Sequence, residues 1–322
     1  MTFRNYYNLM MTVIGEMVKY ILKKTIISIV ALWAIITVSF ILLHMLPGNP
    51  FGSLSAMDRD MQLRIMNYYG LDQPIYKQYY LYCKGLLQGD FGYSLKHIGK
   101  SVNEVILESF PYSAILGLQA YVFGVPLGIL LGSISAMKNG KYADYALVFF
   151  SAIGTSVPIF IIGTLLQYVF AIRLSWFPIA RWHGYSSTIL PSLTLSIGII
   201  ANKTRMMRTL MLETISEDYI RTAQAKGIPP IKIVFRHQIR NAIVPLVSTM
   251  GVEIAAILMG SFVVEQIYAI PGLGAYYVSA IQNLDYTMTL GLTVFYSTLV
   301  IITNLIVDVL YGVIDPRIRV AK

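Results

Sequence analysis

Few side chains in this sequence could carry out chemistry, and their spacing argues against a catalytic centre. The chain of 322 residues contains one cysteine, Cys83, and four scattered histidines. A single thiol excludes an internal disulfide and a thiolate metal cluster, and the dispersed histidines do not suggest a zinc site. Two acidic residues, Glu253 and Asp308, instead lie in or near long apolar stretches. An acidic side chain costs roughly 2.5–3.5 kcal/mol at mid-bilayer, so we expect both residues to face protein or water.

These two carboxylates suggest different roles. Glu253 lies nearer the middle of its apolar stretch and is a candidate for a residue that lines a translocation path, with simple packing as the alternative. Asp308 lies closer to the chain end, where we expect a structural partner such as Arg317. Residues 94–101 resemble a phosphate-binding loop, but Ser94 stands where that motif requires glycine. The sequence therefore predicts no bound cofactor in this chain.

The composition indicates a protein whose surroundings are largely lipid. Hydrophobic residues make up 56% of the chain, charged residues 13%, and the mean hydropathy is +0.63. An average soluble domain carries about 25% charged residues. These values disfavour a cytosolic enzyme and a disordered chain, and they favour an integral membrane protein.

The apolar stretches predict an all-α membrane fold with six transmembrane helices, because a backbone in lipid must form its hydrogen bonds within its own helix. Trimmed at turn residues, they predict helices near 25–46, 112–136, 146–172, 187–202, 242–264 and 290–311. The fourth is short and rich in serine and threonine. Gly124, Gly128 and Gly132 in the second form a ladder of small residues that permits close helix contact, which we expect to occur within this subunit rather than with a partner.

Lysine and arginine set the predicted orientation. With the N-terminus inside, the inner segments hold 17 of the 25 basic residues, as expected for cytoplasmic loops. Both termini are therefore predicted to be cytoplasmic. The net charge of +9 is then explained by topology and anionic lipid rather than by nucleic acid. The chain divides into the following segments: a cytoplasmic start at 1–24, a first span at 25–46, an extracytoplasmic loop domain at 47–110, a five-helix core at 111–311 and a cytoplasmic tail at 312–322.

The loop domain at 47–110 is predicted to be an ordered lobe outside the membrane. It holds six basic and six acidic side chains, and turn residues recur along it. The sequence leaves two interpretations open for this lobe. It is either a solvated connector or a surface that contacts an external partner.

The inner segment 203–240 has its own helix signals. Residues 214–217 fit a capping box, and Gly227 followed by Pro229 and Pro230 predicts a stop, so we expect a helix at 216–226. A second helix is expected over 231–241, in which basic residues recur at every fourth position. Ile231, Phe235 and Ile239 follow the same spacing and are expected to form its apolar face. The small residues near Gly227 permit close docking on a cytoplasmic partner. The alternative is an amphipathic hairpin that lies on the inner leaflet.

Several motifs, in order, resemble the permeases of ATP-binding-cassette importers, and more narrowly the B-type subunit of the dipeptide, oligopeptide and nickel branch. They are Leu46-Pro-Gly-Asn-Pro50, Tyr69-Gly-Leu-Asp-Gln-Pro74, Gly89-Asp-Phe-Gly-Tyr-Ser94, Tyr219-Ile-Arg-Thr-Ala-Gln-Ala-Lys-Gly227, Arg236-His-Gln-Ile-Arg-Asn-Ala-Ile-Val-Pro245, Pro271-Gly-Leu-Gly274 and Asp315-Pro-Arg-Ile-Arg319. The general permease signature has Glu-Ala-Ala where this chain has Arg221, Thr222 and Ala223, a departure that the peptide branch shares.

The resemblance implies a type I importer permease fold and a non-enzymatic subunit in a bacterial inner or plasma membrane. Its implied partners are a second, homologous permease, two ATPase subunits that hold the ATP and Mg²⁺, and an extracytoplasmic substrate-binding protein. It assigns residues 216–227 to a coupling helix, in which the candidate ATPase contacts are Glu217, Tyr219, Arg221, Thr222, Ala223, Ala225, Lys226 and Gly227. Pro271, Gly272 and Gly274 become candidates for facing the binding protein.

The implied cargo is a dipeptide or oligopeptide, with a nickel or metal-chelate complex as the alternative within the same family. A secondary transporter is the main rival from another class. It would show ion-coupling charges in several spans and an internal repeat. A membrane enzyme would need clustered catalytic groups at a membrane surface. The sequence shows neither pattern.

Overall fold

Helices form nearly all the regular structure of the chain. The computed structural model describes residues 3–45, 59–70, 72–94, 96 and 99–314. Within these ranges, the pairing of Tyr93 with Ser101 is an isolated bridge and no strand forms. The motifs at 46–50 and 315–319 lie outside the described residues.

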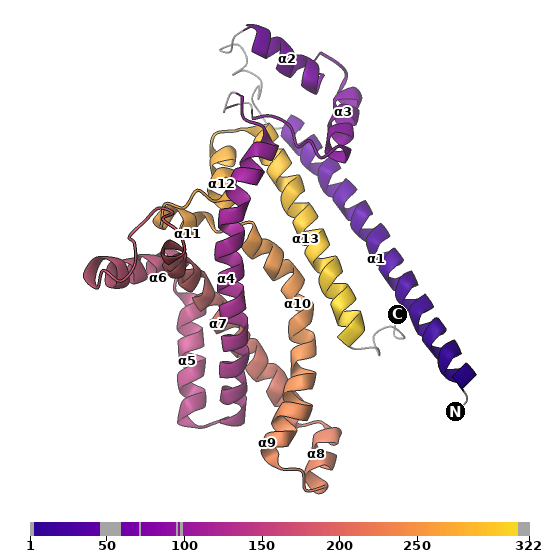
Figure 1. The fold of residues 1–322 in the computed structure, drawn as a ribbon, viewed down its shortest axis with the longest axis vertical. Helices are drawn as coiled ribbons and strands as arrows, with labels where there is room; N and C mark the ends of the chain where they lie inside the picture. Colours follow the sequence, from indigo (N-terminus) through magenta and orange to yellow (C-terminus); the bar gives the residue numbers. More distant parts are fainter. Residues whose placement is uncertain (1–2, 46–58, 71, 95, 97–98, 315–322) are drawn as a thin grey trace.

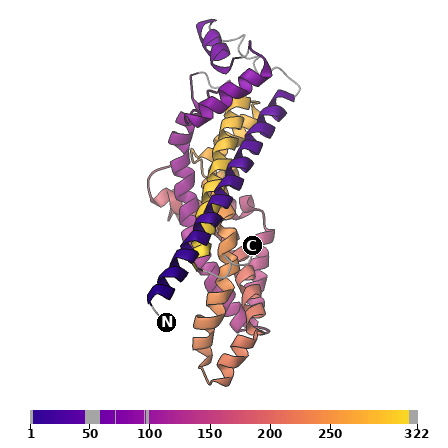
Figure 2. The same ribbon diagram turned by 90° about the vertical axis from the view of Figure 1, so that its right-hand side faces the viewer.

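The first helix is much longer than predicted. α1 (Phe3–Met45) already includes residues assigned to a cytoplasmic segment, and it contains the apolar stretch Ile21–Leu42. It runs along α13 (Tyr286–Ile314) at the side of the bundle (Figure 1 and Figure 2). The predicted span at 25–46 is therefore the second half of one continuous helix.

Two short helices, α2 (Arg59–Tyr69) and α3 (Ile75–Leu87), lie within the segment 47–110 that was predicted to form an external lobe. They lie at the opposite end of the molecule from α8 (Asp218–Ala225) and α9 (Pro230–Ile233) (Figure 1). α4 (Val102–Met137) begins ten residues before the second span predicted at 112–136, at a capping box. In that box Glu104 N–H donates to Ser101 Oγ over 3.1 Å and the Ser101 N–H donates to the Glu104 carboxylate over 3.0 Å.

The glycine ladder of α4 packs against α7 (Ser186–Ile215), as predicted for contact within the subunit. A Cβ atom on Gly128 would lie 2.6 Å from Cβ of Lys203, and one on Gly132 would lie 2.5 Å from the Thr204 carbonyl oxygen. Side chains at these positions would push the two helices apart. The glycines thus let two membrane helices approach backbone to backbone.

The predicted third span is not one straight helix. α5 (Tyr142–Ser156) ends at Val157, and α6 (Ile159–Leu166) continues through the π-helical turn η2 (Gln167–Arg173) at an angle of 102° to α5. The reason is Pro158, which disfavours helical geometry in the residue before it. Val157 accordingly has an extended ψ of 125°.

The chain after α7 returns through a hairpin and then enters the last two long helices. α8 (Asp218–Ala225) is followed by α9 (Pro230–Ile233), the π-helical η3 (Val234–Ile239) and α10 (Arg240–Leu258). α10 stops where Gly260 adopts a φ of +89°. Two short helices, α11 (Phe262–Ile267) and α12 (Leu273–Gln282), then lead to α13.

The number of spans falls below the predicted six when helices are judged by length and hydropathy alone. In the described chain four segments qualify: Ile21–Leu42, Val102–Met137, Pro230–Ile267 and Tyr286–Val307. The bent pair of α5 with α6 and η2 makes a fifth if it forms one span. α7 is not among them. It contacts α4, α5, α6, α10 and α11, and most of its serine and threonine side chains are buried there, whereas Asn202, Arg205 and Thr209 are exposed.

Candidate functional site

The predicted stop of the short inner helix is confirmed. α8 ends in a Schellman motif, in which the Gly227 N–H donates to the Gln224 carbonyl over 2.9 Å and the Ile228 N–H donates to the Ala223 carbonyl over 3.2 Å. Gly227 has a φ of +72°, a conformation that glycine adopts without steric cost. Pro229 and Pro230 then begin α9.

The predicted capping box at the start of this helix is wrong. The Thr214 hydroxyl donates to the Leu210 carbonyl within α7 over 2.7 Å instead of capping α8. Glu217 occupies the N-cap position and makes no side-chain capping bond. α7 continues to Ile215, so a hydroxyl at residue 214 bonds to the preceding turn of its own helix.

α8 packs on α9 through a small apolar cluster. Ile220, Ala223 and Ile233 are buried, and Ile228 covers them. Seven of the eight predicted coupling residues are exposed, namely Glu217, Tyr219, Arg221, Thr222, Ala225, Lys226 and Gly227. Ala223 belongs to the internal cluster, so its small size serves packing within the hairpin. The hairpin thus presents a polar outer face on a fixed apolar base.

The second predicted helix does not end at Asn241. It continues through η3 into α10, so the hairpin and the following span share one helical rod. The residues that turn inward also differ from the prediction. Ile233, Val234 and Gln238 are buried, whereas Ile231 and Phe235 are exposed. The wider turn of η3 shifts the buried face away from the spacing of four that was expected.

A polar cluster joins three long helices inside the bundle. The ammonium of Lys203 on α7 lies 2.6 Å from Oε2 and 2.8 Å from Oε1 of Glu253 on α10. The same ammonium donates to Thr249 Oγ1 over 3.2 Å, and Tyr121 on α4 donates to Glu253 Oε2 over 3.0 Å. The ion pair therefore holds α7 to α10, the two helices on either side of the hairpin.

The two ends of this ion pair differ in exposure. The Lys203 side chain is 1% exposed, and that of Glu253 is 34% exposed. Sequence analysis placed Lys203 in a cytoplasmic segment, directly after the span predicted to end at 202. In the structure α7 continues past Lys203 to Ile215, and the Lys203 ammonium is neutralised by Glu253. The predicted path residue is thus half of a neutral pair.

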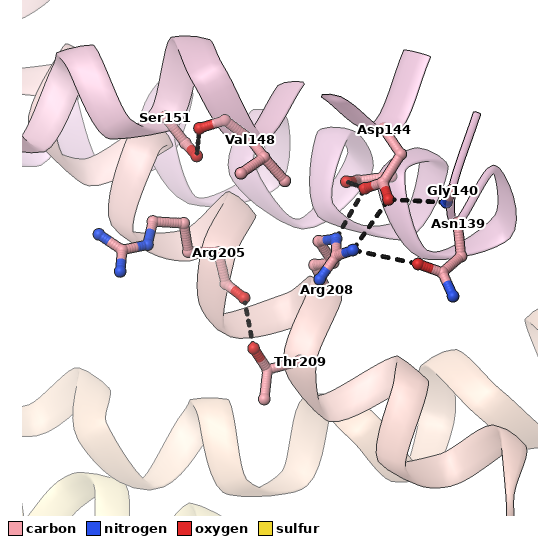
Figure 3. Close-up of polar contacts among 9 residues, drawn as sticks. Asn139, Gly140, Asp144, Val148, Ser151, Arg205, Arg208 and Thr209 are labelled. Atoms are coloured by element: carbon pink, nitrogen blue, oxygen red, sulfur yellow. Dashed lines mark hydrogen bonds and ion pairs between the residues drawn. The ribbon is translucent and has the colours of Figure 1, made fainter. Parts of the chain in front are cut away.

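A second ion pair ties α7 to the turn between α4 and α5. Arg208 Nε and Nη2 lie 2.7 and 2.8 Å from the two carboxylate oxygens of Asp144, and Nη2 also donates to Asn139 Oδ1 over 3.1 Å. The Gly140 N–H donates to Asp144 over 3.0 Å. Figure 3 shows this cluster, with Arg205 pointing away from it. We call it the Arg208–Asp144 clamp.

A third carboxylate, Glu265 on α11, is enclosed by backbone. It is 1% exposed, accepts hydrogen bonds from Ser113 Oγ over 2.7 Å and the Ala275 N–H over 2.9 Å, and has no ion pair among the described residues. The Leu273 N–H donates in turn to Ser113 Oγ over 2.8 Å. The carboxylate thereby holds the start of α12 against α4.

This arrangement explains the glycines that were predicted to face a binding protein. A Cβ on Gly272 would overlap the Glu265 carboxylate, and one on Gly274 would come within 2.9 Å of the Phe262 nitrogen. Both glycines are buried, whereas Pro271 is exposed. Of the three predicted residues, Pro271 alone presents its side chain at the surface.

Comparison with known families decides the class of this protein. Residues 124–320 match the family model described as the inner membrane component of binding-protein-dependent transport systems, and residues 17–117 match the model of its N-terminal part. The chain belongs to this family. It is therefore a permease, and the resemblance seen in its sequence motifs is confirmed.

Curated relatives of this permease align over nearly its whole length. It is 40% identical to the dipeptide transport system permease protein DppB of Bacillus subtilis, over 95% of this chain and 99% of that protein. It is 41% identical to the oligopeptide transport system permease protein OppB of Salmonella typhimurium, over 94% of this chain and all of that protein. A solved chain of the inward-facing MetNI methionine ABC transporter aligns with a TM-score of 0.48 and 18% identity, covering 66% of this permease and 96% of that chain.

Two of the polar clusters were not found from the sequence. Asp144 and Arg208 are 64 positions apart, and nothing in their local patterns links them. The sequence did contain a signal for Lys203 that was missed. No glycine or proline lies between Gly198 and Lys203, so nothing stops the preceding helix before this lysine. In the described part of the permease, no three His, Cys, Asp or Glu side chains group as metal ligands.

Proposed function

We propose that this permease is the transmembrane subunit of an ATP-driven, binding-protein-dependent importer of dipeptides or oligopeptides. The support is the 40% identity, over nearly the full length, to proteins named for dipeptide and oligopeptide transport. We propose six spans with both termini in the cytoplasm. α7 is the span that a hydropathy measure misses, because its polar side chains lower its mean hydropathy.

In this proposal α8 is the coupling helix. The observation that carries it is the exposed polar face of α8, held on an apolar base between α7 and α10. A partner that binds this face moves α7 and α10 together, because Lys203 and Glu253 join these two helices within the bundle. The partners are two ATPase subunits, which hold the ATP and Mg²⁺, a homologous second permease and an external binding protein.

Alternating access requires two states of similar energy and a ligand that favours one of them. ATP on the partner subunits is that ligand, and the hairpin transmits its effect to the spans. Glu253, one-third exposed on α10, is the proposed path residue. Its charge is balanced by Lys203, so the path near it is close to neutral and tolerates peptides of either charge.

The test is reconstitution of the complete complex in proteoliposomes, with labelled dipeptides, pentapeptides and a nickel chelate as cargo. We expect uptake of peptides that requires ATP and the binding protein. Concentration of a solute by this chain alone would contradict the importer assignment. Uptake of the nickel chelate without peptide uptake would support the importer assignment but contradict the proposed peptide cargo.

A further inference from the structure

The lobe helix α3 is attached to α1 along one of its faces. Tyr79 and Thr37 share a hydrogen bond of 2.6 Å between their hydroxyls, and His44 Nε2 lies 3.3 Å from Gln78 Oε1. Phe40 packs edge-on against Tyr79, with ring centroids 5.3 Å apart, and stacks on Tyr82, with centroids 6.0 Å apart. The position of α3 along α1 is therefore fixed by side-chain contacts.

These contacts set the depth of α3 relative to the membrane. The first polar residue after the apolar run of α1 is His44, and Thr37 lies seven residues before it. At a rise of about 1.5 Å per residue, the Tyr79 hydroxyl is bound roughly 10 Å inside the apolar run. Helices that lie in a membrane interface bury their apolar face about 5–10 Å into the boundary between headgroups and acyl chains. The middle of α3 lies at that level.

The opposite face of α3 is apolar and has no cover within the described chain. Tyr76, Tyr80 and Leu87 are 70%, 65% and 90% exposed, and their spacing of four and seven places them on one side of the helix. Lys77 and Lys84, both exposed, flank this side. Tyrosine favours the membrane interface because its ring is apolar and its hydroxyl polar, and lysine can extend its ammonium to water from there.

We propose that α3 is an interfacial helix whose face of Tyr76, Tyr80 and Leu87 inserts into the lipid leaflet opposite α8. The occupant is lipid because α3 is bound at the depth of the apolar segment, next to side chains of α1 that are themselves apolar and exposed. Trp33, Val38 and Ile41 of α1 are 59%, 55% and 49% exposed. The lobe then rests on the membrane and braces α1, and it is not a connector in water. This inference depends on the membrane fold and not on the proposed cargo.

The experiment measures the depth of a fluorescent label on α3 in the complete complex. Cys83 is the only cysteine of the chain, so Cys83→Ala provides a cysteine-free background, although the partner subunits must be cysteine-free as well. Tyr80→Cys and Leu87→Cys each carry the label in vesicles of phosphatidylcholine and phosphatidylglycerol. Arg64→Cys on α2, also exposed, is the matched control.

We expect nitroxide lipids to quench the labels at Tyr80→Cys and Leu87→Cys at least threefold more than the label at Arg64→Cys. Aqueous iodide should show the opposite order. Addition of the binding protein should leave both orders unchanged. Equal quenching by iodide at all three positions would overturn the proposal, and so would protection of the α3 labels that appears only with the binding protein, which would identify a protein-docking face. If the labels at Tyr80→Cys and Leu87→Cys are quenched alike, the result does not come from a local disturbance of α3 by one of the two substitutions.

Discussion

Lys203 and Glu253 form an ion pair across the bundle, in which the ammonium lies 2.6 Å from a carboxylate oxygen and is almost completely buried, while the carboxylate is one-third exposed. The pair joins α7, which enters the hairpin of α8 and α9, to α10, which leaves it. Because the two charges differ in access to water, removing one or the other should lower the stability of the complex by different amounts.

The first prediction concerns stability. Glu253→Gln leaves a buried ammonium without its counter-charge, and breaking a buried pair in this way costs about 3–5 kcal/mol. Lys203→Met leaves a carboxylate that water can still reach, so its cost should be smaller. The double variant Lys203→Met with Glu253→Gln should recover much of the loss. Thermal unfolding of the purified complex measures all three, and a Lys203→Met variant that is the least stable would contradict this assignment of burial.

The second prediction concerns cargo. Glu253→Gln leaves a local charge of +1 and Lys203→Met leaves −1, so the two variants should shift selectivity in opposite directions. We expect a change of about two- to tenfold in the uptake ratio of a lysine-containing to a glutamate-containing peptide, equivalent to roughly 0.4–1.4 kcal/mol. Uptake by proteoliposomes is the measurement. Equal effects on both peptides in both variants would remove Glu253 from the path.

The third prediction separates backbone conformation from crowding at Gly227. A Cβ atom there would meet nothing within 4 Å, so the effect of a substitution comes from the φ of +72°. Left-handed geometry costs a residue with a side chain roughly 1–2 kcal/mol, and Asn tolerates it best. Gly227→Val should therefore shift the hairpin and reduce ATP-driven uptake, whereas Gly227→Asn should retain it. Normal uptake by Gly227→Val would disprove the coupling role of this turn.

The fourth prediction concerns the Arg208–Asp144 clamp. Arg208→Lys keeps the charge but loses the paired geometry of the guanidinium, so α7 is held less firmly to the α4–α5 turn. We expect the complex to hydrolyse ATP with less peptide transported per ATP. Arg205→Lys is the control, since Arg205 makes a single long contact of 3.4 Å with Thr155. An equal loss in both variants would mean that the clamp has no special part in coupling.

The fifth prediction concerns the enclosed carboxylate. Gly272→Ala places a methyl group on Glu265, and overpacking of this kind costs about 1–3 kcal/mol. The loss should largely disappear in Glu265→Ala with Gly272→Ala, compared with Glu265→Ala alone, because the collision is then gone. Gly198→Ala is the control, since a Cβ there meets open space. Additive losses in the double variant would show that the glycine does not make room for the carboxylate.

The sequence was sufficient for features that depend on local chemistry. Gly227 followed by two prolines predicted the end of α8, and the glycine ladder of α4 predicted a close helix contact. Pro158 carried the same kind of information about the bend after α5, but the apolar run around it was interpreted as one helix. A measure of hydrophobicity alone does not detect a bend such as the one at Pro158, because the residues on both sides of it are apolar.

Other features depend on which helices meet. The fourth span was predicted to end at residue 202 because the search followed charge-free stretches, whereas Lys203 is accommodated by a carboxylate fifty positions away. The partnership of Arg208 with Asp144 likewise arises only after α5 and α7 pack together. The expected partnership of Asp308 with Arg317 lies outside the described residues and stays a prediction.

The π-helical turn η3 has a consequence for the path. A π-turn accommodates one residue more than the corresponding α-helical turn. That extra residue sets the rotational phase of α10 relative to α9, and through it the direction in which Glu253 points. Deleting one residue there would rotate α10 by about 100°. The alignment of the exposed face of α8 with the proposed path residue Glu253 is thus encoded in a single added residue between them.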